Sequence, residues 1–204
     1  GMREEADMSI TRCIGRPRDK TRDVVIEKAT VELLQEVGYE NVTIESVATR
    51  AQVSKATIYR RWKNKAALVT DSVHHYAFGY APTIDTGTLR GDLIEVIAEK
   101  EKTMKSAEGQ LISGLMSMAR TDEDLSEVLS ERLSGYASVA HTAIFNRAVS
   151  RGEIPKEAQR ELILQLVPAV IGFRIFMTRE TITRKFIENF VDDVLIPVLT
   201  HSSK

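Results

Sequence analysis

Residues 43–65 have the sequence TIESVATRAQVSKATIYRRWKNK, and this stretch decides the fold. A helix-turn-helix unit needs a small residue where its helices cross, an apolar residue at the turn, and a cap and an inward anchor on the second helix. These four positions are held, in order, by Ala48, Val53, Ser54 and Ile58. The spacing therefore predicts a helix-turn-helix whose second helix begins after Ser54.

One position of the predicted turn departs from the usual pattern. The turn commonly carries glycine, and this chain has Gln52 there. A residue other than glycine costs roughly 1 kcal/mol in a left-handed backbone conformation. We expect the turn to be strained or slightly altered in shape.

The outward face of the second helix is cationic, and its first residues are small enough to let the helix approach base edges. Lys55 and Arg60 can donate to guanine O6 and N7 or to phosphate, and Thr57 can contact a thymine methyl. Each charge taken singly is more typical of a solvated surface, but the helix-turn-helix spacing favours DNA contact. Trp62 fits either a core anchor or a phosphate contact.

A basic stretch, Gly15-Arg16-Pro17-Arg18, precedes the first predicted helix and suits a flexible arm that enters a minor groove. Other polar side chains of the helix-turn-helix suit phosphates. The predicted DNA contacts are Arg16, Arg18, Thr43, Ser54, Lys55, Ala56, Thr57, Tyr59, Arg60, Arg61 and Lys65.

The charge distribution supports this location. The 204 residues carry a net charge of −1, with 28% charged and 43% hydrophobic residues, as in ordinary folded proteins. Residues 12–65 hold 12 Lys/Arg and 7 Asp/Glu, and residues 66–204 hold 15 and 19. The excess of positive charge in the first segment is what a polyanion-binding region needs.

Apolar residues recur at steps of three and four along nearly the whole chain, and no alternating strand pattern appears. We therefore expect an all-α protein, with an N-terminal three-helix helix-turn-helix DNA-binding domain and a C-terminal helical ligand-binding and dimerisation domain. The predicted divisions are 1–18 for the flexible basic arm, 19–65 for the helix-turn-helix domain, 66–80 for a connecting helix and 88–204 for the second domain.

The last two predicted helices, 155–179 and 183–200, are apolar on more than one face, which indicates more than one packing partner. A second copy of the chain would supply that partner, and two-fold pairing is how short recognition helices gain specificity. Pro168 should kink its helix. The predicted dimer contacts are Leu162, Leu166, Ala169, Val170, Phe190, Val191 and Val194.

Methionine and aromatic residues in the second domain suit an adaptable apolar cavity, although core packing is the more ordinary role of any one of them. The predicted ligand-binding residues are Met104, Leu115, Met118, Tyr136, His141, Phe145, Phe173, Phe176 and Met177.

Other classes are disfavoured. No run approaches about 20 apolar residues, so we expect no membrane span. The single cysteine, Cys13, favours a reducing, cytoplasmic setting. No enzyme motif occurs, and the adjacent His74 and His75 point about 100° apart on a helix, so we expect neither catalysis nor a metal or other cofactor.

The whole chain resembles the TetR/AcrR regulators. The sequence motifs that carry the resemblance are Val37-Gly38-Tyr39, Val42-Thr43-Ile44, residues 53–62, Lys63-Asn64-Lys65 and Leu68, with looser matches at 88–93 and 173–176. The resemblance implies about nine helices, a four-helix dimer interface built by the last two, and lower DNA affinity when ligand binds the second domain.

These features together predict a homodimeric, sequence-specific repressor that leaves double-stranded operator DNA when a small apolar or amphipathic effector binds. Two alternatives stay open. The chain can be a helix-turn-helix scaffold that acts through another protein, or an all-α enzyme.

Overall fold

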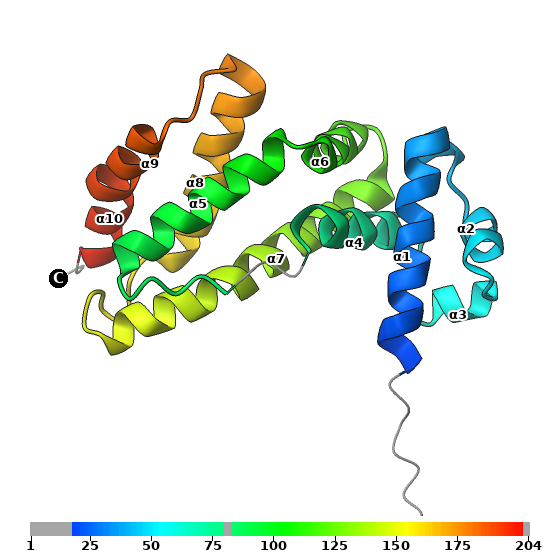
Figure 1. Ribbon diagram of the computed structural model, residues 1–204, viewed down its shortest axis with the longest axis horizontal. Coiled ribbons are helices and arrows are strands. Elements are labelled where there is room, and N and C mark those ends of the chain that lie inside the picture. Colours follow the sequence, from blue (N-terminus) through cyan, green and yellow to red (C-terminus); the bar gives the residue numbers. More distant parts are fainter. Residues whose placement is uncertain (1–17, 80–82, 202–204) are drawn as a thin grey trace, which may run out of the picture.

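The computed structural model describes residues 18–79 and 83–201, without the side chains of residues 18, 19 and 133–140. All regular elements in these ranges are helical, which confirms the predicted all-α class. The molecule is elongated, with α2 and α3 at one end and α9 and α10 at the other (Figure 1).

The first end holds the predicted helix-turn-helix. In chain order the elements are α1 (Arg18–Val37), the short 3-10 helix η1 (Tyr39–Asn41), α2 (Ile44–Ala51), α3 (Lys55–Tyr59) and α4 (Lys65–Phe78). α1 lies against both α2 and α4, so α4 joins this end to the rest of the chain.

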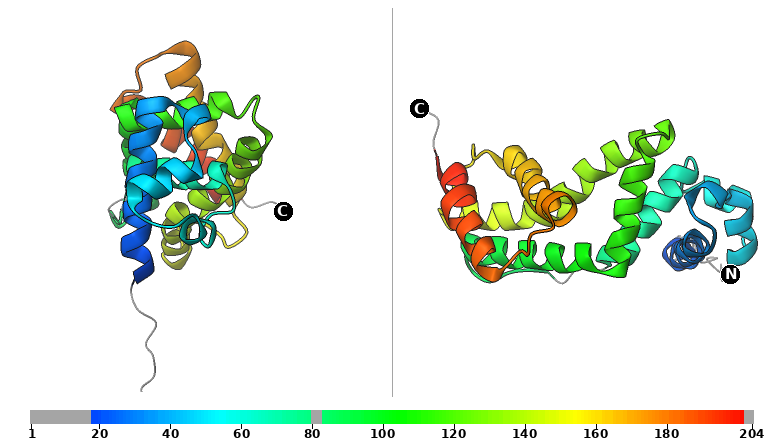
Figure 2. Two further views of the ribbon diagram at one scale, coloured as in Figure 1. Left: turned by 90° about the vertical axis from the view of Figure 1, so that its right-hand side faces the viewer. Right: turned by 90° about the horizontal axis from the view of Figure 1, so that it is seen from above.

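The remaining elements form the larger part of the molecule, with α7 as its longest helix (Figures 1 and 2). They are α5 (Leu89–Lys105), α6 (Ala107–Met118), α7 (Glu123–Ser150), α8 (Arg160–Gly172), the π-helix η2 (Phe173–Thr178), α9 (Arg184–Phe190), the π-helix η3 (Val191–Leu195) and α10 (Ile196–Thr200).

Side-chain caps fix where most of these helices begin. A helix leaves its first amides without intrahelical partners, and a short polar side chain can accept from one of them. Thr43, Ser54 and Asn64 cap α2, α3 and α4 in this way, and the cap at Ser54 confirms the predicted start of the second helix of the motif. Thr88 and Asp122 do the same for α5 and α7.

The predicted helix over 155–179 was wrong at its start. The chain between Pro155 and Gln159 forms a turn, in which the Ala158 amide donates to the Pro155 carbonyl at 3.2 Å, and α8 begins only at Arg160. Pro168 lies inside α8, and the helix continues beyond Gly172 as η2, with the wider π spacing.

Two hydrophobic clusters hold the described part together. One joins α1 to α4 with residues of α6 and α7, among them Leu115, Leu125 and Val128. The other joins α5 and the second half of α7 to α8, α9 and α10. Because the first cluster extends into α6 and α7, the helix-turn-helix end is packed directly on the larger part.

Candidate nucleic-acid interface

The turn between α2 and α3 has the expected backbone. Gln52 adopts the left-handed conformation, with φ 57° and ψ 44°, and the Val53 amide donates to the Ala48 carbonyl at 3.0 Å. The motif therefore keeps its usual geometry at the cost of placing a side-chain-bearing residue in a region that favours glycine.

Two buried side chains fix α3 against the core. Ile58 has no exposed surface, and Trp62, just beyond the helix, keeps 3%. The Trp62 indole nitrogen donates to Asp71 Oδ2 of α4 at 3.1 Å. Trp62 is thus a core anchor, and its alternative interpretation as a phosphate contact was wrong.

The cationic side chains on α3 and just after it are exposed, but two of them form ion pairs with acidic residues. Lys55 Nζ lies 2.7 Å from Glu45 Oε1, and Arg61 Nε lies 2.9 Å from Asp23 Oδ2. The hydrogen bond between the first pair raises the pKa of Lys55 and lowers that of Glu45. In the DNA-free protein, part of the positive charge in and next to α3 is therefore neutralised by Glu45 and Asp23.

Two further predicted DNA contacts, Arg60 and Lys65, make hydrogen bonds to nearby residues of the chain. Arg60 makes long hydrogen bonds back to α3, to the Ala56 carbonyl at 3.4 Å and to Thr57 Oγ1 at 3.5 Å. Lys65 Nζ donates to the Tyr39 carbonyl at 2.9 Å and lies 4.3 Å from the centroid of the Tyr39 ring. Lys65 is consequently more constrained than Arg60.

The rest of the predicted DNA set divides by exposure. Tyr59 is 53% exposed, and Thr57 and Lys65 are half-buried. Arg16 and the side chain of Arg18 lie outside the described residues. The remaining members are exposed, namely Thr43, Ser54, Lys55, Ala56, Arg60 and Arg61.

The predicted dimer residues are split between surface and core. Leu162 and Val194 are 47% and 37% exposed, Ala169 is exposed, and Leu166 and Val170 are half-buried. Phe190 and Val191 instead pack inside the protomer, with 7% and 0% exposed. The prediction of these two residues as dimer contacts was wrong, because a side chain enclosed by its own chain has no surface left for a partner.

Three predicted ligand residues lie on η2 at the surface. Phe173, Phe176 and Met177 are 57%, 39% and 72% exposed. They continue the exposed face of α8.

Within the described residues, Arg160–Thr178 is the one helical segment that is long and apolar enough to cross a membrane, by length and composition only. Its mean hydropathy is 1.6, and 17% of this segment is buried inside the protein.

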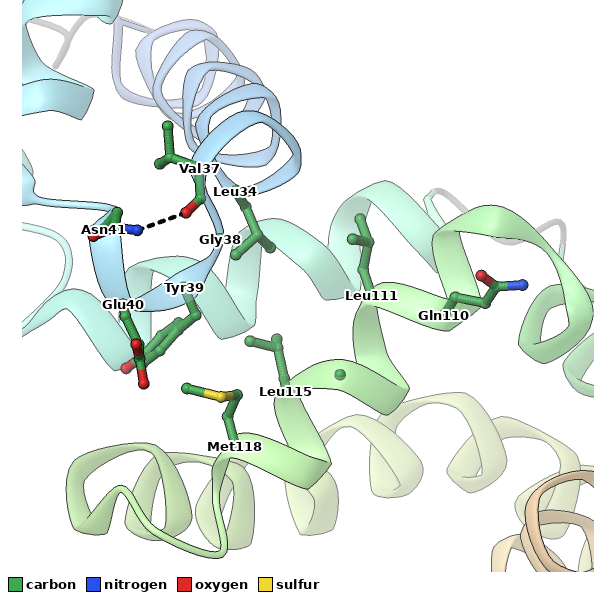
Figure 3. A pocket seen from close by; sticks show the side chains of 11 residues that line it. Leu34, Val37, Gly38, Tyr39, Glu40, Asn41, Gln110, Leu111, Leu115 and Met118 are labelled. Atoms are coloured by element: carbon green, nitrogen blue, oxygen red, sulfur yellow. Dashed lines mark hydrogen bonds between the residues drawn. The ribbon is translucent and has the colours of Figure 1, made fainter.

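The other predicted ligand residues do not converge on one site. Leu115 and Met118 line a cavity of about 440 Å³ between the end of α1, η1 and α6 (Figure 3). Phe145 and His141 are buried in α7, Met104 is half-buried on α5, and the side chain of Tyr136 is not described. The ranges that the structure describes contain no cluster of three or more His, Cys, Asp or Glu suited to a metal ion.

Sequence reasoning missed a polar contact between α5 and α7. Lys100 Nζ lies 3.3 Å from His141 Nε2, and burial lowers the pKa of Lys100 to about 8. Lys100 follows Ile97 and Val96, both buried, so its place on the inner side of α5 was the available signal.

Comparisons with known proteins agree along the chain. The family described as bacterial regulatory proteins, tetR family, matches residues 26–71, and the tetracyclin repressor-like C-terminal domain matches residues 83–194. The uncharacterized HTH-type transcriptional regulator Rv1556 of Mycobacterium tuberculosis is 31% identical over 96% of this chain and 98% of its own. The DNA-binding transcriptional repressor TetR of Mycobacteroides abscessus is 32% identical over 89% of this chain and 96% of its own.

A solved structure, that of the TetR family transcription regulator SCO0332, has the same fold. Its TM-score is 0.69 at 24% identity, and the match covers 87% of this chain and 97% of the other. From the exposed, capped and anchored α3 and from these matches, the chain belongs to the tetR family of helix-turn-helix transcriptional regulators.

Proposed function

We propose that this regulator is a homodimeric repressor that binds operator DNA through α3 and leaves it when a small molecule binds among the helices of residues 88–204. The observation that carries the proposal is α3 itself, which is capped at Ser54, fixed at Ile58 and cationic on its outer face. The relative from Mycobacteroides abscessus that is named a repressor supports the direction of regulation. Such a protein works in the cytoplasm, where the DNA is.

DNA recognition is assigned to residues 19–65. Lys55, Thr57 and Arg60 contact base edges in the major groove, because they lie on the exposed side of the capped helix. Tyr59, Arg61 and the polar caps of α2 and α3 contact phosphates, which fix the register of the protein on the duplex. Lys65 and the first amides of α4 contact phosphates as well, and the arm that holds Arg16 and Arg18 follows the minor groove.

Dimerisation is assigned to the exposed face of α8 and η2, with Val194. Large apolar side chains rarely form a contiguous exposed patch on a monomer, and such a patch is typical of an interface. Leu162, Phe173 and Met177 are each about half or more exposed on this face. Covering them with a second copy removes that apolar area from water and brings two α3 helices onto one duplex, about 34 Å apart.

Communication between the two ends runs through α4 and the start of α7. Asp71 of α4 accepts from Trp62 through one oxygen and from Arg132 Nε of α7 through the other, at 3.1 and 2.9 Å. Lys63 also lies 3.6 Å from Glu127 of α7. A ligand that shifts α7 relative to α4 therefore changes the position of α3 and lowers the population of the DNA-competent state.

The decisive experiment selects duplexes from a random pool with the purified protein and then measures affinity for the selected DNA. We expect an inverted repeat, and we expect Lys55→Ala and Arg60→Ala to reduce the preference for it. Lys28→Ala is the matched control, since Lys28 is a highly exposed lysine of α1. If no sequence is enriched, or if all three variants bind alike, α3 is not the reading helix.

A further inference from the structure

A lysine of α5, Lys100, contacts α7, the long helix that lies beside α5 in the larger part of the molecule (Figure 1). Lys100 Nζ is 3.3 Å from Nε2 of His141, whose side chain is 2% exposed. The His141 ring stacks on Phe145, with ring centroids 6.1 Å apart and an interplanar angle of 28°. A primary amine therefore points at an aromatic interior rather than at bulk water.

No carboxylate balances this amine in the described residues. The ion pairs there, within 4.0 Å, do not include Lys100, and residues 133–140, whose side chains are not described, contain no Asp or Glu in sequence. Burial lowers the pKa of Lys100 to about 8, so the amine is still mostly protonated at neutral pH. A partly buried cation without a counter-charge is costly, and an anion entering the site removes that cost.

A second cation lies beside the same aromatic ring. The guanidinium carbon of Arg160 is 6.0 Å from the centroid of Phe145, and its NH1 donates to Asn146 Oδ1 at 3.2 Å. Its Nε is buried and has no hydrogen-bond partner in the described part of the chain. Phe145 thus lies beside the guanidinium of Arg160 and stacks on His141, the residue that Lys100 contacts.

We propose that the Lys100 ammonium, positioned by His141, binds the carboxylate of an effector that is a weak acid with an apolar body. This inference rests on the proposed function and names the effector class. An ammonium has three donors, and one of them faces His141, so the others are available for a carboxylate. Charge-assisted hydrogen bonds of this kind are stronger than neutral ones.

The same geometry selects against other ligands. A neutral molecule of the same shape leaves the ammonium without a counter-charge, and an amine adds a second positive charge beside it. The effector should therefore be preferred as an acid over the alcohol or amine of the same skeleton.

The experiment measures direct binding of matched pairs to the full-length protein by calorimetry and thermal shift. The panel runs from acetate to decanoate, with benzoate, and each acid is paired with the primary alcohol of the same skeleton. We expect at least one acid to bind more tightly than its alcohol. Lys100→Met should weaken the binding of that acid about tenfold or more and should change the binding of the alcohol little.

Two further variants keep the test decisive. Lys100→Arg retains the charge and should retain part of the preference for the acid, and Lys102→Met removes an exposed lysine of the same helix and should leave the preference unchanged. The inference is overturned if no acid of the panel binds better than its alcohol, or if Lys100→Met keeps the preference.

A second measurement, release of the selected DNA by each compound, distinguishes failure of the acid-effector inference from failure of the proposed function. If neutral compounds release the DNA and acids do not, the sensor function stands and the acid class is wrong. If no compound binds or releases DNA, the sensor function itself fails, and the inference fails with it.

Discussion

Asp71 of α4 joins the indole of Trp62, just beyond α3, to α7, because one of its oxygens accepts from Trp62 at 3.1 Å and the other from Arg132 of α7 at 2.9 Å. The side chain of Asp71 is mostly buried, with 16% exposed, so both hydrogen bonds are sheltered from water. Trp62 is the single tryptophan of the chain, and its fluorescence reports on this contact.

Asp71→Asn should loosen this connection. Hydrogen bonds to a charged group contribute about 1.5–3 kcal/mol, so we expect a loss on the order of 2 kcal/mol in the free energy of unfolding. We also expect a shift in Trp62 emission and a weaker effect of effector on DNA affinity. Urea unfolding followed by fluorescence measures the first two. Glu127→Gln, on the exposed pair with Lys63, is the control and should cost little; equal losses in both variants would contradict the assignment.

Glu45→Gln should strengthen binding to DNA of any sequence. The substitution frees Lys55 and removes a negative charge next to the phosphates, so we expect a roughly two- to fivefold gain at low salt and a steeper salt dependence. Titrations at several salt concentrations measure both. Glu157→Gln makes the same charge change at an exposed position between α7 and α8 and should leave binding unchanged. Weaker binding of Glu45→Gln would instead mean that Glu45 holds Lys55 in its reading position.

Gln52→Gly should stabilise the protein. Glycine relieves roughly 1 kcal/mol of left-handed strain, and its greater freedom in the unfolded chain cancels part of this gain. We expect a net increase below about 1 kcal/mol and a higher melting temperature. Gln110→Gly, inside α6, should lower stability by about 1 kcal/mol. A loss at both positions would show that the Gln52 side chain contributes more than its backbone costs.

Leu162→Glu should dissociate the dimer without unfolding the protomer. Leu162 is 47% exposed, so a charge there is tolerated in the protomer but is costly when a second copy covers it. Sedimentation should show a monomer, and affinity for the selected inverted repeat should fall by about two orders of magnitude. Met116→Glu, at 45% exposure on α6, is the matched control and should remain dimeric. A dimeric Leu162→Glu protein would move the interface elsewhere.

Lys100→Met should make the ligand-free protein more stable at neutral pH, and the gain should depend on pH. Because the folded-state pKa of Lys100 is lowered from 10.5 to about 8, the unfolded chain binds more protons between these values. The stability of the parent protein therefore rises through this window relative to the variant. The gain should be constant below pH 8 and shrink towards pH 10.5, as measured by urea unfolding across the range. Lys102→Met should show no such trend.

The helix-turn-helix was predictable because its determinants are local. The caps at Thr43, Ser54 and Asn64, the anchor at Ile58 and the left-handed Gln52 each depend on neighbours within a few residues. By contrast, the pairs of Lys55 with Glu45 and of Arg61 with Asp23 span 10 and 38 positions. No periodic pattern indicates such pairs, so sequence reasoning did not find them.

The larger part was less predictable for a related reason. An apolar stripe shows that a helix face is covered but not by what, so Val191 and Leu162 had the same signal although one is buried in the protomer and the other exposed. The predicted ligand residues likewise fell in different places, Leu115 beside the cavity near α1 and Phe173 on the surface. Assigning them requires the crossing geometry of α5, α6 and α7.

The length of α7 sets how far a small change at one end of the protein is carried. Its 28 residues extend about 42 Å at 1.5 Å per residue. A rotation of about 5° at the far end of such a rod moves its near end by roughly 4 Å, close to the 3.4 Å step of one base along a strand. If two copies pair through α8 and η2 as proposed, a tilt of this size would move their α3 helices out of register with successive major grooves.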